Sequence, residues 1–370
     1  MPRDSNITRI YIVFTSYQFK VALVHRRTYP GTGGALLVHH QSIVPSRDEL
    51  KEFDELLSFQ AGTGIRSDSN RQTFQILRQR FEHLIAHADR QSVPDLFVCS
   101  IAYPLTNWLI THFVGRLRTS ILIDGLSGYL PLRKPVVREL ADGLRKLYVG
   151  LFIGIKTSWI FKHPQGLDSD FVHDLYAEMP ALLSAHRKPV NLLPSVFEPL
   201  DASQRELARL DVWFLGQPHT LRGKKLVDLL MQLLAALRRD HPEARDFIYR
   251  THHFEAASVS ELIRSTGFKV EEGHGCVEEL LCARPPIAVY SYRSTALLNL
   301  RRILPTDIPV VAFAPWLVQP PEEKLLYGDI QQWMLTLGID RPAPASAVFA
   351  LEVELGRRQT WQSQLRRLVR

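Results

Sequence analysis

Short apolar segments alternate with helix-compatible segments along most of the chain. Residues 9–14 form an apolar run rich in β-branched and aromatic side chains, a polar pair follows, and residues 17–25 are compatible with a helix. This order predicts a strand, a turn and a helix at the start of an α/β domain. Further strands are predicted at residues 35–38, 96–100 and 120–123, and helices at residues 47–57 and 71–88.

The same alternation restarts in the second half of the chain, after a stretch at residues 163–199 that is rich in Asp, His and Pro and predicts no regular element. Strands alternating with helices over short connections indicate a doubly wound, mainly parallel sheet covered on both faces. The predicted strands are residues 211–215, 247–249, 268–270, 287–291 and 309–313, and the predicted helices are residues 226–238, 258–265, 277–281 and 296–300.

The length of 370 residues exceeds what one ordinary hydrophobic core covers, because single cores stop growing at about 250 to 300 residues. We therefore expect an α/β protein with two Rossmann-like domains, residues 1–200 and residues 201–370, with a site in the cleft that they face. Ligands of such sheets bind at the carboxyl ends of the strands, where the helices begin.

Composition places the protein among ordinary globular chains, with 45% hydrophobic and 22% charged residues. The three cysteines have no zinc or disulfide spacing, which indicates reduced thiols. No apolar stretch of signal-peptide length opens the chain, and its longest apolar run, Leu147 to Ile155, is about half of a membrane span. These features predict a soluble, cytoplasmic protein.

A net charge of +7 favours anionic partners. Nucleic acid is not the expected partner, because the chain has no RNA-recognition, zinc or helix-turn-helix signature and its charge forms no obvious stripe. At the C-terminus, Trp361, Leu365 and Leu368 fall on one helical face beside arginines. This pattern fits either a helix packed on the domain with a solvated basic side or a helix that contacts a membrane surface.

Three predicted strand ends carry candidate chemistry. Asp124 follows a strand and precedes Gly125, where it could accept a proton from a hydroxyl or simply form a turn. His252 and His253 follow another strand and could bind a phosphate, donate a proton or ligate a metal. Metal binding is the weakest option, because neighbouring side chains on an extended segment point in opposite directions and no third ligand has matching spacing.

Ser294 and Thr295 stand where a predicted helix begins, so they could hold a phosphate or act as an ordinary helix cap. The glycine-rich stretch at residues 29–34 lacks the spacing of a dinucleotide loop and the lysine of a nucleoside-triphosphate loop. We interpret it as a flexible connection.

Read in order, these motifs resemble those of the bacterial sialyltransferases, including the α-2,8-polysialyltransferases, that build lipooligosaccharide and capsule polysaccharides. The family has an acidic-acidic-glycine motif, a histidine-proline motif and a Ser/Thr motif before a helix. Two further segments fit: Gly216-Gln217 within Leu-Gly-Gln-Pro, and Glu278-Glu279 before the Ser/Thr motif. Two positions depart from the pattern, because Ile123 replaces the first acid and His253 replaces the proline.

The resemblance implies the GT-B fold and an inverting, metal-independent transfer of sialic acid from CMP-sialic acid to a glycan hydroxyl, without a cofactor. Asp124 would act as the base, and His252 would assist the leaving phosphate. Nucleotide and phosphate contacts would come from the second domain, and acceptor or sugar contacts from the first; the implied residues are Gly216, Gln217, Glu278, Glu279, Ser294 and Thr295 in the second and Ser16 and Gln18 in the first.

Such an enzyme would work in the cytoplasm, with possible contact to the inner face of the inner membrane through its basic terminal helix. Two alternatives stay open at this point. The chain could be a GT-B transferase that uses another nucleotide sugar. It could instead be a degenerate homologue that binds a nucleotide or glycan without transfer, which the departures at Ile123 and His253 suggest.

Overall fold

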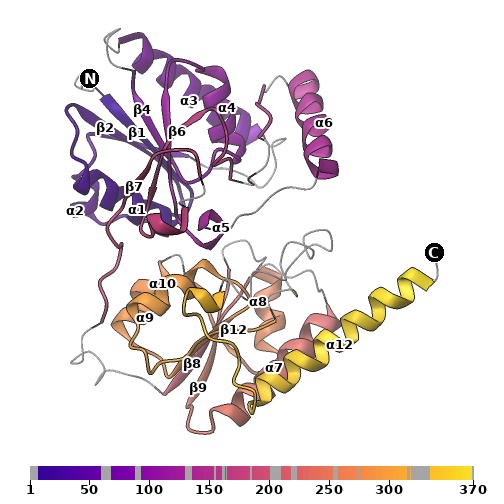
Figure 1. Cartoon of the computed structure of the whole chain (residues 1–370). Helices are drawn as coiled ribbons and strands as arrows, with labels where there is room; N and C mark the ends of the chain where they lie inside the picture. Colours follow the sequence, from indigo (N-terminus) through magenta and orange to yellow (C-terminus); the bar gives the residue numbers. More distant parts are fainter. Residues whose placement is uncertain are drawn as a thin grey trace. The chain divides into compact units, whose positions relative to one another are not determined.

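The architecture was obtained as a computed structural model of the whole chain (Figure 1). It describes residues 7–59, 68–87, 93–129, 136–153, 156–160, 163, 165–183, 186–200, 210–217, 223–252, 257–273, 275–314, 317 and 334–368. The chain divides into two compact units, residues 1–196 and residues 197–370. We refer to them as the N-terminal unit and the C-terminal unit and describe each separately.

The N-terminal unit is built on a seven-stranded sheet in the order β3-β2-β1-β4-β5-β6-β7. Each pair of neighbouring strands is parallel. The strands are β1 (Ile7–Val13), β2 (Gly34–His40), β3 (Glu55–Phe59), β4 (Asp95–Val98), β5 (Arg118–Leu122), β6 (Val172–Ala177) and β7 (Val190–Leu192). The central strands are apolar on both faces, as a sheet covered by helices on both sides requires.

Helices cover both faces of this sheet (Figure 1). They are α1 (Ser16–Thr28), α2 (Arg47–Leu50), α3 (Asp68–His87), α4 (Pro104–His112), α5 (Leu126–Tyr129), α6 (Val136–Ile153) and the 3₁₀ helix η1 (Pro180–Leu183). On one face Phe19 of α1 packs with Tyr11 and Leu37 of the sheet. On the helices α3 and α4, Phe81 and Leu109 are fully buried.

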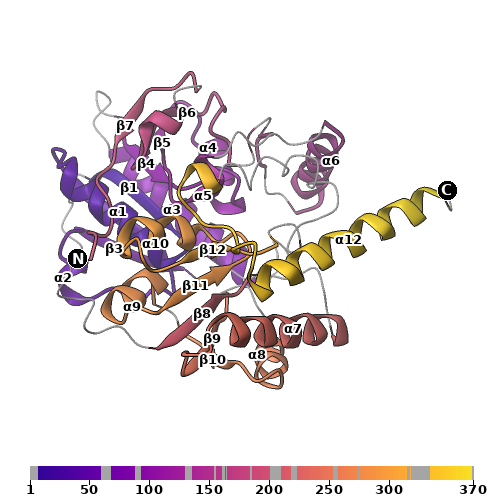
Figure 2. The same cartoon turned by 60° about the horizontal axis from the view of Figure 1, so that its bottom comes forward.

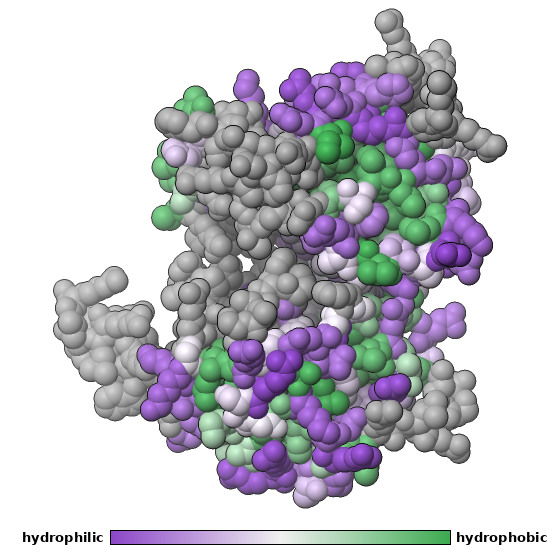
Figure 3. Space-filling view, turned by 180° about the vertical axis from the view of Figure 1, so that it is seen from behind, coloured by the Kyte–Doolittle hydropathy of each residue, from purple (hydrophilic) through white to green (hydrophobic). Residues whose placement is uncertain are grey.

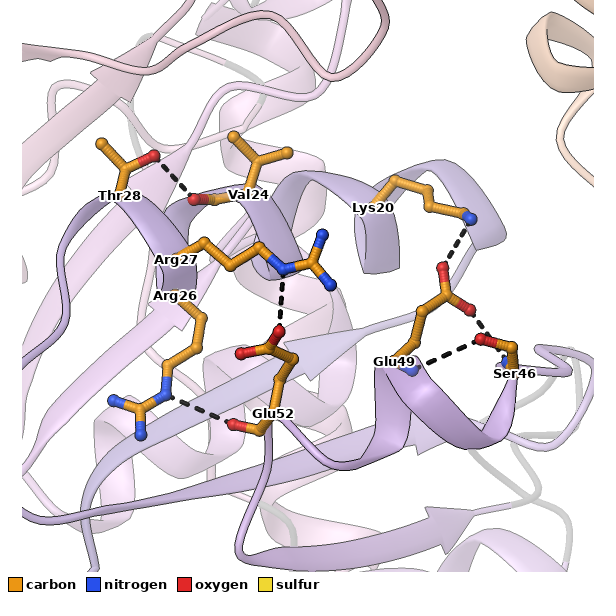
Figure 4. A network of polar contacts seen from close by, with 8 residues as sticks. All are labelled: Lys20, Val24, Arg26, Arg27, Thr28, Ser46, Glu49 and Glu52. Carbon is orange, nitrogen blue, oxygen red and sulfur yellow. Dashed lines mark hydrogen bonds and ion pairs between the residues drawn. The ribbon is translucent and has the colours of Figure 1, made fainter.

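The helix predicted for residues 47–57 is wrong, because that segment contains the short helix α2, a turn and the edge strand β3. Ser46 and Glu49 form a reciprocal capping box that starts α2, and β3 pairs with β2 in parallel. Figure 4 shows how α2 is tied to α1: Lys20 forms an ion pair with Glu49 at 2.6 Å, and Arg27 with Glu52 at 2.9 Å. Exposure alternates along β3, with Leu56 and Ser58 exposed and their neighbours more buried, a period that suits an edge strand.

The C-terminal unit has a five-stranded parallel sheet in the order β10-β9-β8-β11-β12. Each of its strands begins and ends within one residue of the predicted bounds. They are β8 (Asp211–Leu215), β9 (Asp246–Arg250), β10 (Lys269–Glu271), β11 (Ala288–Ser291) and β12 (Val310–Ala312). All five residues of β8 are buried, which identifies it as the centre of this sheet.

Helices again cover the two faces of the sheet, with α7, α8 and α12 on one side and α9 and α10 on the other (Figures 1 and 2). Their bounds are α7 (Lys224–Asp240), α8 (Ala257–Arg264), α9 (Val277–Ala283), α10 (Thr295–Ile303) and α12 (Ala347–Leu368). Leu230 and Leu237 of α7 are completely buried in the core that also holds Phe214, Tyr290 and Val348. None of the helices in the described ranges is long and apolar enough to cross a bilayer.

Regular structure extends into a segment for which the sequence predicted none. Residues 163–199, for which no element was predicted, contain the strands β6 and β7. Residues 29–34 connect α1 to β2, and Gly33 there has a φ of +93°, a conformation that suits glycine. The side chains of the predicted terminal amphipathic face, Trp361, Leu365 and Leu368, lie outside the described residues, since α12 is described to Leu368 in its backbone and to Arg357 in its side chains.

Candidate active site

Both sheets have the strand order in which doubly wound proteins bind their ligands. In the N-terminal sheet β2 and β3 lie on one side of β1 while β4 and β5 lie on the other. In the C-terminal sheet β9 and β10 lie on one side of β8, and β11 and β12 on the other. The chain order therefore reverses beside β1 and beside β8, and ligands bind at the carboxyl ends of strands at such points.

In the N-terminal unit, Gln18 and Asp124 meet at this edge of the sheet. Gln18 Nε2 donates a hydrogen bond to Asp124 Oδ2 at 2.6 Å. Its Oε1 accepts from the backbone N–H of Phe14 at 2.8 Å, just beyond the end of β1. Thr15 caps α1 by accepting from the backbone N–H of Gln18 at 3.2 Å. The strand end and the helix cap together hold the Gln18 amide with its NH₂ group toward the carboxylate.

The environment of Asp124 raises its proton affinity. Burial raises the pKa of this carboxyl to about 6, and the hydrogen bond from Gln18 opposes part of that rise. The carboxyl is therefore mostly ionised at neutral pH but takes up a proton more readily than an ordinary aspartate. A positioned carboxylate with a pKa near the working pH is suited to general base catalysis.

Tyr103 is a further residue of this edge that the sequence analysis did not single out. Its ring lies against Phe14, with ring centroids 4.5 Å apart. Burial and the nearby charge of Asp124 raise the pKa of the Tyr103 hydroxyl, whereas a hydrogen bond with Gln18 lowers it. Tyr103 immediately precedes α4 after β4, so the same rule of strand ends that pointed to Asp124 would have found it.

In the C-terminal unit, Gln217 links the strand ends on either side of the reversal. Its Oε1 accepts from the backbone N–H of Arg293 at 3.0 Å, so the segment after β8 is fastened to the segment after β11. Ser291 Oγ donates to the carbonyl oxygen of Leu215 at 2.7 Å and strengthens the same link. Gly216 lets the ring of Tyr249 pack against the backbone after β8, because a Cβ at this position would lie 2.5 Å from that ring.

Ser294 and Thr295 mark the beginning of α10 beside this link. Ser294 is the N-cap, and its side chain accepts from the backbone N–H of Ala296 at 3.2 Å. The first turn of the helix has no acidic residue. The positive end of the helix dipole is therefore not offset there and favours an anion.

His252 lies two residues beyond β9, which pairs with β8. The backbone N–H of Gly216 donates to the carbonyl oxygen of Arg250 at 2.8 Å, so the two strand ends run side by side. The structure thus brings three predicted groups to adjacent strand ends of one sheet: Gly216 with Gln217, His252, and Ser294 with Thr295. His253 lies outside the described residues.

Comparison with solved structures agrees with this architecture. A 2,6-sialyltransferase of a Photobacterium species, solved in a ternary complex with the donor product CMP and the acceptor substrate lactose, matches with a TM-score of 0.51 and 13% identity over 90% of this chain and 77% of that chain. An α/β-galactoside α-2,3-sialyltransferase of Photobacterium phosphoreum matches with a TM-score of 0.50 and 10% identity over 89% of this chain and 95% of that chain. The chain has the GT-B fold.

Sequence comparison adds nothing to this fold, since no family model and no curated protein sequence matches the chain.

The two acidic residues of the C-terminal unit that were predicted to contact the nucleotide differ in burial. Glu278 is buried, and its Oε1 and Oε2 accept from Asn299 Nδ2 at 2.7 Å and from Cys276 Sγ at 2.9 Å, respectively. Glu279 is exposed. A nucleotide contact by either residue stays a prediction.

Ser16 is the first residue of α1, two residues before Gln18, and is partly buried. Ile123, which stands where the family has its first acid, is 2% exposed and contacts Gly128. Its side chain therefore belongs to the core of the N-terminal unit. Across the described ranges, no three His, Cys, Asp or Glu side chains are grouped so that they could hold a metal ion.

Proposed function

We propose that the protein is an inverting glycosyltransferase that transfers sialic acid from CMP-sialic acid to a hydroxyl of a glycan acceptor without a metal ion. The observation that carries the proposal is the position of the motif residues in a GT-B fold. Gly216, Gln217, His252 and Ser294 follow three adjacent strands of the C-terminal sheet, beside the point where the chain order reverses. This is where a doubly wound sheet binds a nucleotide.

The C-terminal unit would hold the donor in this proposal. The phosphate of CMP-sialic acid would lie at the beginning of α10, where Ser294 and Thr295 offer hydroxyl groups and the helix dipole is positive. His252 would donate a hydrogen bond or a proton to the phosphate as it leaves. These contacts strengthen as negative charge develops on the phosphate, which is how they would lower the barrier.

The N-terminal unit would activate the acceptor. Asp124 would take the proton from the acceptor hydroxyl while that oxygen forms a bond to the anomeric carbon of the sugar. The bond between this carbon and the phosphate oxygen would break at the same time, and CMP would leave with the electron pair. Gln18 would keep the carboxylate oriented through the 2.6 Å hydrogen bond, and its amide would remain engaged throughout.

The proposed acceptors are surface glycans such as lipooligosaccharide or capsule polysaccharide, as the resemblance implies. Ser16 lies beside Gln18 at the start of α1 and would contact the acceptor or the transferred sugar. Contact of the protein with the inner face of a membrane would place it near lipid-linked acceptors of this kind.

Donor identity can be tested by calorimetry with CMP and UDP. We expect CMP to bind more tightly than UDP, and Ser294→Ala to weaken CMP binding by about tenfold, the scale of losing one hydrogen bond to a charged group. Ser46→Ala is the matched control, because Ser46 also caps a helix by accepting a backbone N–H but lies on α2. Tighter binding of UDP would overturn the assignment of CMP-sialic acid and leave a transferase of another nucleotide sugar.

A further inference from the structure

The helix α6 has its apolar side turned to solvent. Val137, Leu140, Leu144, Leu147 and Leu151 recur at alternating spacings of three and four residues, so they share one face of the helix. Each of these side chains is between 56% and 80% exposed. Figure 3 shows apolar side chains at the surface along the edge of the N-terminal unit that carries α6. An apolar face of this extent on a surface helix marks an interaction site.

Residues of α6 outside the apolar stripe attach the helix to the protein. At Gly143 a Cβ would lie 2.5 Å from the indole of Trp159, so the helix backbone rests directly on that ring. Lys146 Nζ donates to the carbonyl oxygen of Ser158. Ser158 is in turn fixed to α4, because its backbone N–H donates to Asn107 Oδ1 at 2.8 Å. These contacts hold α6 with its apolar stripe outward.

Charge decides between the possible occupants of this stripe. Within the described residues 136–153 and 156–160, which include α6, the sequence has four basic and two acidic residues, a net charge of +2. A second copy of the chain packed against α6 would bring two such stretches together, and like charges repel. An anionic lipid surface would instead attract the basic residues while its acyl region accepts the leucines.

We propose that α6 is a membrane-binding helix that lies in the interface of a bilayer rich in anionic phospholipid. The stripe Val137, Leu140, Leu144, Leu147 and Leu151 enters the boundary between headgroups and acyl chains, and the net positive charge of the segment favours anionic headgroups. The stripe shares no residue with the candidate active site or with the terminal helix α12, and the proposal does not depend on the proposed sugar transfer.

The test is cosedimentation of the full chain with vesicles, one set of phosphatidylcholine alone and one containing phosphatidylglycerol in addition. We expect binding to the phosphatidylglycerol vesicles, weaker binding in raised salt because the charges are screened, and at least about tenfold weaker binding for Leu144→Gln/Leu147→Gln. Ile76→Gln is the matched control, since Ile76 is an exposed apolar residue of α3, and it should bind as the wild type does.

A second pair, Leu140→Gln/Leu151→Gln, repeats the test with the other exposed leucines of the stripe, and thermal unfolding checks that each variant is folded. Equal vesicle binding by wild type and by both folded leucine variants would overturn the proposal and point to another surface such as α12. Absence of vesicle binding by the wild type would also overturn it. A wild-type dimer that the leucine substitutions dissociate, without vesicle binding, would show that a second copy covers the stripe.

Discussion

Gln18 has both ends of its side-chain amide engaged, and this determines which end meets Asp124. Its oxygen accepts from the backbone N–H of Phe14, so its NH₂ group is left for the carboxylate. Sequence alone could place Asp124 and Gln18 at strand ends, because each follows an apolar run closely. The 106 positions that separate them conceal the contact, which forms only after β1, β4 and β5 pair.

The pH dependence of transfer should report Asp124. With a pKa of about 6, the base loses its proton between pH 5 and 7, so kcat/KM should rise about tenfold per unit below pH 6 and level off above it. Because the hydrogen bond from Gln18 lowers this pKa, Gln18→Met should move the rise to higher pH. Initial rates over this range measure both effects, and a profile that Gln18→Met and Asp124→Asn leave unchanged would exclude Asp124 as the base.

The raised pKa of Asp124 also makes the stability of the folded protein depend on pH. Asp124 binds a proton more tightly in the folded protein than its ordinary pKa of 3.8 allows, so its contribution to stability is present below that value and is lost as the pH rises through about 6. Asp124→Asn should therefore reduce the difference in unfolding free energy between pH 4 and pH 7. Urea unfolding at the two pH values measures this difference.

Restoring the family's first acid should damage the fold. Ile123 is 2% exposed and contacts Gly128, so Ile123→Asp would place a carboxylate where an apolar side chain is buried. We expect a loss of about 3 kcal/mol or more in unfolding free energy, against about 1 kcal/mol for the control Ile123→Val. Urea unfolding measures both. A stable, more active Ile123→Asp protein would instead indicate that the chain is a degenerate transferase.

At the scale of elements, the strands of the C-terminal sheet and the most buried strands of the N-terminal sheet were predictable, whereas β3, β6 and β7 were not. Residues 211–215 are apolar apart from the first and form β8 with the predicted bounds, because a central parallel strand must bury both of its faces. Residues 55–59 do not alternate between polar and apolar residues and follow a good helix start at Ser46, so a helix was predicted where the chain turns into an edge strand. The strands β6 and β7 lie in a stretch rich in Asp, His and Pro and gave no periodic signal.

The packing of α9 on α10 rests on a buried polar pair. Glu278 accepts from Asn299 at 2.7 Å, and both side chains are buried, so removal of one partner takes a buried hydrogen bond from the other. A double-mutant cycle of Glu278→Ala and Asn299→Ala, measured by urea unfolding, should show a coupling energy of about 1 to 3 kcal/mol. Strictly additive effects would mean that the two side chains act independently.

For the whole molecule, the two βα patterns in the sequence predicted two doubly wound sheets, and the structure confirms this fold class. The order of strands within each sheet could not be derived, because periodicity identifies a strand without naming its neighbours. The order matters for function, since it places the reversal beside β8 and so brings Gln217 to Arg293. The similarity to solved structures identifies the GT-B fold. The argument for the proposed chemistry rests on the residues at the strand ends.

Release of CMP from CMP-sialic acid, without added metal and with a panel of glycan acceptors, tests the central claim most directly. We predict acceptor-stimulated release that falls by about 100-fold or more in His252→Ala and in Asp124→Asn, the scale of losing a general acid or base. His83→Ala, an exposed histidine of α3, is the control and should be as active as the wild type. No release by the wild type with any acceptor, or equal release by His252→Ala, would contradict the account.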